Sequence, residues 1–294
     1  MDKKQPYWTF AALGSAGLIA GWPPVAATLT LASRQDEYTH ILLILPIVAA
    51  LLYRDRAAFK NTANPDRRLG AVVLAGSLFA AVGTYWQRSS LAPDVQLSLY
   101  IFALVSWWIG SFVFSFGVGF ARQERFALSF LYWLVPWPSL VLDIAVGWLQ
   151  RESAVAASWM FALSRTHVSL DDTILMLPGL TLNVAPECSS LRSSLLLVIT
   201  TMIFSQLFLR SPWRKLALVL AAILLSPVKN GLRIFVIGYL TLRVDPSYLT
   251  GHLHHDGGIV FLATAQAIIF ALLWMLRRGE TKDQASAGVQ AVAH

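Results

Sequence analysis

The chain has 294 residues, of which 56% are hydrophobic and only 13% are charged, and its mean hydropathy is +0.59. A soluble domain of this composition would expose a large apolar surface, and the alternating pattern of an outer-membrane barrel is absent. The net charge of +7 does not indicate nucleic-acid binding, because the basic residues are distributed as in a membrane protein. We therefore predict an all-α polytopic membrane protein.

Apolar segments of roughly the length that crosses a hydrocarbon core recur along the chain. The first is interrupted by Pro23 and Pro24, and we expect about eight transmembrane helices in total. We expect them in a single membrane-embedded domain, 1–277, followed by a disordered cytoplasmic tail, 278–294. The predicted spans are 8–31, 38–53, 69–87, 96–120, 126–145, 189–209, 214–242 and 259–276.

Basic residues gather on alternate connections between these spans. The positive-inside rule makes this side cytoplasmic, which predicts a multi-pass protein of the inner (plasma) membrane with both termini in the cytoplasm. The segments 146–187 and 243–258, and the start of the helix after Cys188, then lie on the outer, periplasmic face. The basic residues on the inner side are Lys3, Lys4, Arg54, Arg56, Lys60, Arg67, Arg68, Arg122, Arg125, Arg210, Arg214, Lys215, Arg277, Arg278 and Lys282.

The long outer segment has a pattern of its own. Residues 141–163 mix apolar and charged side chains, which is typical of an amphipathic helix in the membrane interface. Residues 174–177 and 180–184 resemble strands on either side of Pro178 and Gly179, which favour a turn. We expect a small β-hairpin here that leads Cys188 to the first turn of the next helix.

Cys188 is the only cysteine of the chain and lies in the sequence PECSSLR, residues 186–192. A helix N-terminus and a nearby guanidinium, here that of Arg192, both favour the thiolate form. The pattern therefore indicates a nucleophile. It is equally compatible with a small buried residue at the start of a helix.

Two further polar clusters lie on the same predicted face. In SPVKNGLRIF, residues 226–235, Pro227, Asn230 and Gly231 are expected to loosen a span, and Arg233 follows among apolar residues. A charge in such a place usually faces a cavity or a partner, although an interfacial arginine can also extend to lipid phosphates.

The third cluster is TGHLHHDGG, residues 250–258, which contains three histidines and an aspartate. Histidine can carry protons near neutral pH. The group is also compatible with a metal site, although it lacks the fixed spacing of a helical zinc motif. It is equally compatible with a polar interfacial loop. Together the three clusters supply a nucleophile, a proton carrier and a donor for an oxyanion.

These residues resemble the exosortase/archaeosortase family of integral-membrane cysteine transpeptidases. The family pattern is Cys-Ser-Gly followed by Arg, then Asn-x-x-Arg, then His with Gly four positions later. The motifs ECSSLR, NGLR and HHDGG occur in that order. The resemblance places the nucleophile at Cys188, the arginine at Arg233 and the histidine at His254. Ser190 stands where the family usually has Gly.

Two further stretches extend the resemblance over most of the chain. DEYTHILLILP, residues 36–46, is similar to the acidic-Tyr-Ser-His stretch of the family, and VPWPSLV, residues 135–141, is similar to its proline-containing segment. The supporting or substrate-binding residues that we select are Glu187, Arg192, Asn230, His255, Tyr38 and His40.

The resemblance implies a peptidase that sorts secreted proteins bearing a C-terminal signal. Such a signal is a short Pro-Glu-Pro-like motif, one transmembrane helix and a basic tail. Cys188 would form a thioester at the motif, with His254 as acid or base and Arg233 beside the oxyanion or a substrate carboxylate. The acceptor, a lipid or a glycan-linked group, stays open, as does hydrolysis in place of transfer. No cofactor, metal or nucleic acid is expected.

Two alternatives remain at this stage. A non-enzymatic component of exopolysaccharide export would tolerate loss of the Cys188 thiol. A metal-binding transporter would use His252, His254, His255 and Asp256 and would be indifferent to Cys188. The transporter also needs polar residues deep within several spans, and the sequence has few of these.

Overall fold

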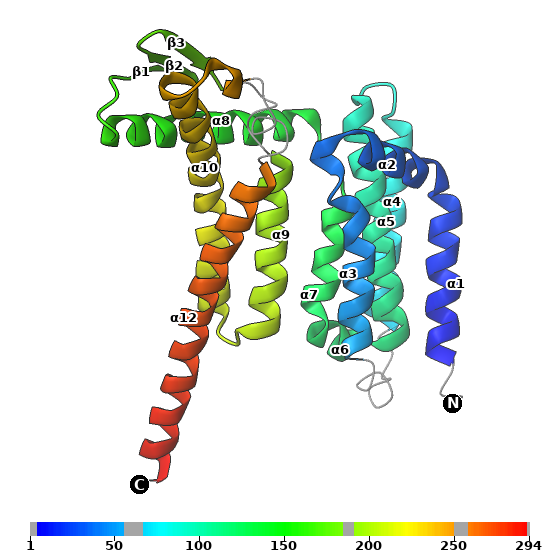
Figure 1. The fold of residues 1–294 in the computed structure, drawn as a ribbon. Coiled ribbons are helices and arrows are strands. Elements are labelled where there is room, and N and C mark those ends of the chain that lie inside the picture. The colour runs from blue at the N-terminus through cyan, green and yellow to red at the C-terminus, as the bar shows by residue number, and fades with distance from the viewer. Residues whose placement is uncertain (1–4, 56–66, 185–190, 250–257, 293–294) are drawn as a thin grey trace. The chain divides into compact units, whose positions relative to one another are not determined.

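The computed structural model describes residues 5–55, 67–184, 191–249 and 258–292. The chain divides into two compact units, Met1–Leu142 and Asp143–His294. Helices make up most of both units (Figure 1).

The first unit begins with two helices where the sequence predicts one interrupted span. α1 (Gln5–Ala20) and α2 (Trp22–Arg34) meet at an angle of 75°, because proline at the start of α2 lacks the N–H that would continue the helix. The other elements of this unit are η1 (Asp36–Tyr38), α3 (Ile41–Arg54), α4 (Arg67–Trp86), α5 (Pro93–Phe116), α6 (Val118–Gln123), α7 (Arg125–Phe130) and η3 (Leu131–Leu134).

Helix α5 is the centre of the first unit and packs against α1 and α4. A methyl group added at Gly70 of α4 would lie only 2.4 Å from the Cα of Phe114, so the glycine permits the two backbones to approach closely. On the other side, the indole N–H of Trp107 donates to the carbonyl oxygen of Leu13, over 2.8 Å. Small residues and indole hydrogen bonds thus hold α5 between its neighbours.

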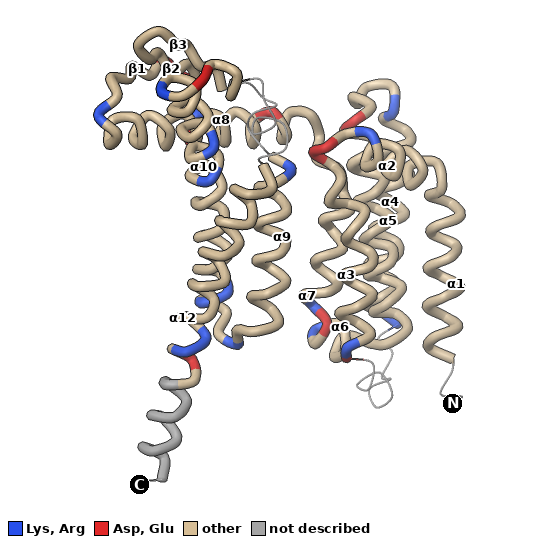
Figure 2. Tube along the Cα trace, in the orientation of Figure 1, with Lys and Arg blue, Asp and Glu red and all other residues tan. Residues whose placement is uncertain are grey.

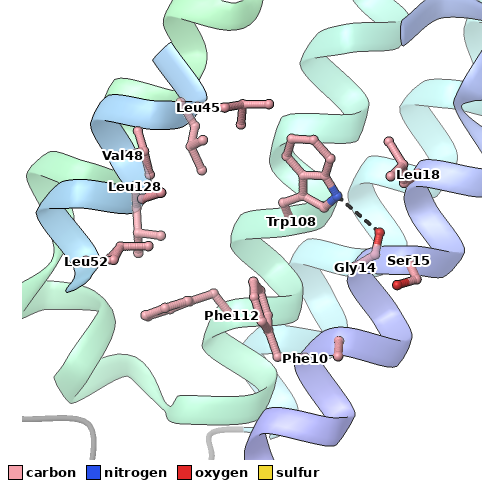
Figure 3. Close-up of a pocket in the computed structure, with 13 residues that line it drawn as sticks. Phe10, Gly14, Ser15, Leu18, Leu45, Val48, Leu52, Trp108, Phe112 and Leu128 are labelled. Atoms are coloured by element: carbon pink, nitrogen blue, oxygen red, sulfur yellow. Dashed lines mark hydrogen bonds between the residues drawn. The ribbon is translucent and has the colours of Figure 1, made fainter. Parts of the chain in front are cut away.

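An apolar pocket of about 390 Å³ lies between α1, α3, α5 and α7. Figure 3 shows Trp108 at its edge, where the indole N–H donates to the carbonyl oxygen of Gly14 over 3.2 Å. Ser15 contributes the one side-chain hydroxyl of the lining. Among the described residues that line the pocket there is no cysteine, histidine or charged side chain.

The span predicted at 126–145 is not a single helix, because two helices meet there at an angle of 97°. The helical part ends at Leu134, and the next helix begins at Ser139. Two prolines, Pro136 and Pro138, stand in the interval, and a residue before proline is driven out of the helical conformation. The same apolar run without these two prolines would have continued as one helix.

The second unit consists of a long helix, a small sheet and three packed helices. Its elements are α8 (Ser139–Leu163, whose first residues belong to the first unit), β1 (Ser169–Asp171), β2 (Ile174–Leu177), β3 (Leu180–Asn183), α9 (Leu191–Phe208), α10 (Pro212–Arg243), η5 (Pro246–Leu249) and α12 (Gly258–Val292).

The structure confirms the predicted helix at 141–163 and the predicted hairpin. Strands β2 and β3 pair antiparallel with Leu177 opposite Leu180, and Gly179 has the positive φ of 79° that suits the glycine of a Pro-Gly turn. Strand β1, which pairs with β2, was not predicted. Its three residues are too few to show an alternating pattern.

Helices α9, α10 and α12 pack lengthwise around an apolar core (Figure 1). Residues 193–208 of α9, 216–228 of α10 and 258–276 of α12 carry no charge, and Figure 2 shows this uncharged stretch of the helices, as the cost of charge in hydrocarbon requires. The core residues are Leu197, Leu209, Leu218, Ala222, Ala265, Ile269 and Leu273.

Pro227 lies inside α10, yet the helix is continuous from Pro212 to Arg243. The predicted loosening near Pro227 does not interrupt the helix. Beyond the apolar part, α12 runs to Val292 and so includes most of the segment 278–294 that we expect to be disordered. The carboxylate of Glu280 accepts hydrogen bonds from the backbone N–H groups of Arg210 and Ser211, which ties α12 to the turn between α9 and α10. The domain bounds stay a prediction.

Six helices of the described chain are long and apolar enough to cross a membrane, or up to eight if two bent pairs each form one span. The predicted fold class, an all-α polytopic membrane protein with about eight spans and a small β-structure, is confirmed.

Candidate active site

The NGLR motif lies where α10 crosses α8 (Figure 1). A methyl group at Gly231 would come within 2.6 Å of the Cβ of Ala156 and 2.9 Å of the carbonyl oxygen of Ser153. Beside it, the side-chain amide of Asn230 donates to the hydroxyl of Ser153 over 3.0 Å. The glycine permits the approach and the amide fixes it, so two residues of the motif hold α10 against α8.

The small sheet covers the same crossing. Ala154 and Ala157 of α8 share a buried cluster with Leu175 and Val184. The side-chain amide of Gln150 also donates to the carbonyl oxygen of Val184 over 2.7 Å. The last described residue before the cysteine segment is therefore bound to α8.

A different face of α10 contacts the first turn of α9. The ammonium of Lys229 donates a hydrogen bond to the hydroxyl of Ser193. Lys229 is 4% exposed, which is rare for a lysine. We did not select this residue from the sequence, although a lysine beside Asn230 within an apolar span was a visible signal.

Arg233 follows Lys229 by one helical turn and so shares its face of α10. It is partly buried, and it lies near enough to Lys229 for the two positive charges to repel each other. Arg192 is the second residue of α9 and is exposed. Two predicted arginines and one additional lysine therefore lie where α10 meets the beginning of α9.

The predicted nucleophile and the predicted histidines lie outside the described residues. Cys188 and Glu187, with Ser190, belong to the segment 185–190, and His254 and His255 belong to 250–257. Each segment precedes a described helix along the chain: Cys188 precedes the first residue of α9 by three positions, and His254 precedes the first residue of α12 by four.

Tyr38 and His40 belong to the first unit, where Tyr38 holds the broken segment at 135–138. The phenol of Tyr38 donates to the carbonyl oxygen of Trp137 over 2.8 Å. Ser98 donates to the carbonyl oxygen of Pro136 over 2.7 Å, and the carboxylate of Asp94 accepts from the N–H of Ser139 over 2.7 Å. Three backbone groups at the break are thus satisfied by side chains, as an apolar setting requires.

His40 is 5% exposed and lies at the start of α3. Its Nδ1 is 3.0 Å from the carbonyl oxygen of Glu37, and its ring meets that of Trp133 edge to face. Nε2 has no hydrogen-bond partner within the described part of the chain. The hydrogen bond from Tyr38 to Trp137 joins the two stretches that resemble the family, 36–46 and 135–141.

Comparison with known families decides what kind of protein this is. A model of the transmembrane exosortase family matches residues 32–271. The chain belongs to the transmembrane exosortase family. Exosortases are in general membrane protein-sorting transpeptidases that use a cysteine and act on substrates with C-terminal sorting signals. Comparison with curated proteins and with solved structures gave no match.

The exosortase match spans every element from α3 to α10, and Cys188, Arg233 and His254 all fall within its limits. The predicted family membership is confirmed. Among the described residues, no three histidine, cysteine or acidic side chains lie close enough to hold a metal ion. The described part of the site is instead a cationic group, Lys229 with Arg233, beside the first turn of α9.

Proposed function

We propose that this exosortase cleaves secreted proteins at a short, Pro-Glu-Pro-like motif next to their C-terminal transmembrane helix and transfers them to an acceptor. Cys188 is the nucleophile, His254 the proton carrier and Arg233 the electrostatic partner. The observation that carries the proposal is the position of Arg233, on the face of α10 that contacts the first turn of α9 through Lys229. Cys188 is three residues from that turn along the chain.

The chemistry follows from these roles. The thiolate of Cys188 attacks the carbonyl carbon of the scissile peptide bond and forms a tetrahedral oxyanion, which a guanidinium stabilises. His254 donates a proton to the departing amine, so that the substrate helix and its tail leave and a thioester remains. A second nucleophile then attacks the thioester and transfers its proton to His254, and Cys188 leaves as the thiolate with which the cycle began.

The cationic group, Lys229 with Arg233, also suits the substrate. The Pro-Glu-Pro-like motif carries a carboxylate, and guanidinium groups bind carboxylates through charge-assisted hydrogen bonds. Arg192 is exposed at the start of α9, and Arg233 lies on the adjoining helix. We propose that one of them orients the motif while the other faces the oxyanion, and that Asn230 acts indirectly by fixing α10 against α8.

We further propose that this chemistry takes place on the periplasmic side of the membrane. With the basic connections inside, the first turn of α9 and the segment 243–258 face the periplasm, where secreted substrates pass. The proposal therefore requires an inner-membrane protein with both termini in the cytoplasm. Fusion of a phosphatase reporter after residue 249 tests the orientation: activity is expected, and an inactive fusion contradicts it.

The decisive experiment follows a co-expressed reporter that ends in a Pro-Glu-Pro motif, one transmembrane helix and a basic tail. Cys188→Ala, Arg233→Ala and His254→Ala should each leave the uncleaved, membrane-tethered reporter to accumulate on a gel. Arg243→Ala, at the end of the same helix as Arg233, and His167→Ala, an exposed histidine of the second unit, should process it normally.

The control variants separate loss of chemistry from loss of folding. Normal processing by Cys188→Ala would refute the thioester mechanism and favour the non-enzymatic alternative. Loss in the control variants to the same degree would show that the assay reports on folding.

A further inference from the structure

Lys229 is buried, and no described residue places a negative charge beside it. No carboxylate pairs with its ammonium in the part of the chain that the structure describes; its hydrogen bond goes to the neutral hydroxyl of Ser193, and the nearby charge of Arg233 is also positive. An ammonium removed from water is destabilising unless an anion compensates it, and an apolar side chain of similar size in such a place is often as stable or more so. Stability therefore does not account for a lysine here.

A second lysine of the same helix gives a direct comparison. Lys215 also bridges α10 to α9, because its ammonium donates to the side-chain oxygen of Gln206 over 2.6 Å. It lies near the other end of the two helices and is only partly buried, so water and the headgroup region can solvate its charge. The two bridges are alike in bonding, and they differ in burial and in which end of α9 they hold.

The bridge from Lys229 holds the end of α9 that matters for the reaction. Ser193 is the third residue of α9 and follows Cys188 by five positions in the sequence. A hydrogen bond to Ser193 restrains the first turn of the helix, where the chain enters from the cysteine segment. It also places a positive charge at a helix N-terminus, which already favours anions.

We propose that Lys229 is a positioning residue of the exosortase reaction, acting through its hydrogen bond to Ser193. This inference rests on the proposed function, because it assumes that Cys188 is the nucleophile. The bond fixes the orientation from which the cysteine segment leaves α9, and Lys229 itself does not exchange a proton with the substrate. The observations that carry it are the burial of Lys229 and its side-chain contact with Ser193 in the first turn of α9.

The test uses full-length protein in liposomes and the sorting-signal reporter, with initial rates measured at several reporter concentrations. Lys229→Met should lower kcat by at least about tenfold, as expected for loss of a hydrogen bond from a charged group, with little change in KM. Lys229→Arg, which keeps the charge and the donor, should recover most of the rate. The kcat of Ser193→Ala should be lowered as much as that of Lys229→Met. The kcat of the double variant should be no lower, because both substitutions remove the same contact.

Two controls make the result specific. Lys215→Met removes the matched bridge at the other end of the helix pair and should keep its rate. Thermal unfolding of Lys229→Met should occur at the same temperature as that of the unmodified protein, or higher, since a buried charge is lost. A lowered unfolding temperature with no rescue by arginine would mean that Lys229 acts only in folding.

The outcomes also separate this inference from the proposed function. If Cys188→Ala abolishes processing while Lys229→Met processes normally, the role of Lys229 is refuted and the proposed function stands. If Cys188→Ala processes normally, the proposed function fails first. Additive losses in the double variant would show that Lys229 and Ser193 act separately, and a rise in KM alone would show that Lys229 binds the substrate instead.

Discussion

The side-chain amide of Asn230 lies 3.0 Å from the hydroxyl oxygen of Ser153, to which it donates a hydrogen bond, and Asn230 is 1% exposed. This contact fixes α10 against α8 at the residue that follows Lys229 of the cationic group. Asn230→Leu removes the donor and forces a larger apolar group against the serine. We expect a loss of about 1–3 kcal/mol in the free energy of unfolding, together with reduced reporter processing. Chemical unfolding in detergent measures the first and the reporter gel the second.

Ser158→Ala is the matched control for that contact. Ser158 lies on the same helix, α8, is partly buried, and its hydroxyl donates to the backbone carbonyl oxygen of Val155. It should unfold like the unmodified protein. An Asn230→Leu protein that is equally stable and active would show that the motif asparagine does not hold the crossing.

Gly231 makes the crossing possible, and alanine there should be strongly destabilising. The added methyl group would lie 2.6 Å from the Cβ of Ala156, so the helices must separate, at a cost of about 1–3 kcal/mol for overpacking. Gly147→Ala in α8 meets only the end of Arg151, at 3.8 Å, and should be neutral or slightly stabilising. Thermal unfolding of the two variants side by side checks this, and equal midpoints would contradict it.

The phenol of Tyr38 is expected to stabilise the first unit through its bond to Trp137. Tyr38→Phe leaves a carbonyl of the broken segment without its donor and should lower the free energy of unfolding by about 1–2 kcal/mol. Tyr85→Phe is the control, because Tyr85 is exposed and its ring contact with Arg88 is kept by phenylalanine. The same loss in both variants would mean that the hydroxyl of Tyr38 has no special role.

Glu124 should make the stability of the first unit depend on pH. Burial, and then repulsion from Asp55, raise the pKa of Glu124 above its usual value, although Arg54 opposes this. Because the folded state binds the proton more tightly than the unfolded state, stability falls as pH rises from the usual pKa of a glutamate through the raised one. At pH 8, Glu124→Gln should therefore unfold at a higher temperature than the unmodified protein. At pH 5 the difference between their unfolding temperatures should be smaller.

Glu152→Gln serves as the control for this pH effect, since Glu152 is exposed. It should follow the unmodified protein at both pH values. An identical pH dependence in Glu124→Gln would show that another group is responsible.

Much of the membrane organisation followed from hydropathy alone. The span predicted at 69–87 is α4, Arg67–Trp86, and the span predicted at 214–242 is α10, Pro212–Arg243. Hydrocarbon excludes polar backbone and charge over a fixed thickness, so an apolar run marks a helix with little help from tertiary contacts. The hairpin around Gly179 was equally local, because a Pro-Gly pair determines a turn by backbone conformation.

The break within the span predicted at 126–145 was missed for a related reason. Hydropathy measures how apolar a segment is and does not measure whether its backbone hydrogen bonds continue. The break at 135–138 is stable because Tyr38 and Ser98, distant in sequence, satisfy its carbonyl groups. No local pattern reports such partners.

The sequence by itself determined the membrane class, the family and the three motifs, because these depend on composition and on residue order. Only the tertiary structure decided what the motif residues touch: Asn230 and Gly231 hold α8, and the neighbouring Lys229 reaches Ser193. A helix presents successive residues to different neighbours, about 100° apart around its axis. Which neighbour each one meets depends on how the helices pack, and the order of residues along α10 does not contain that information.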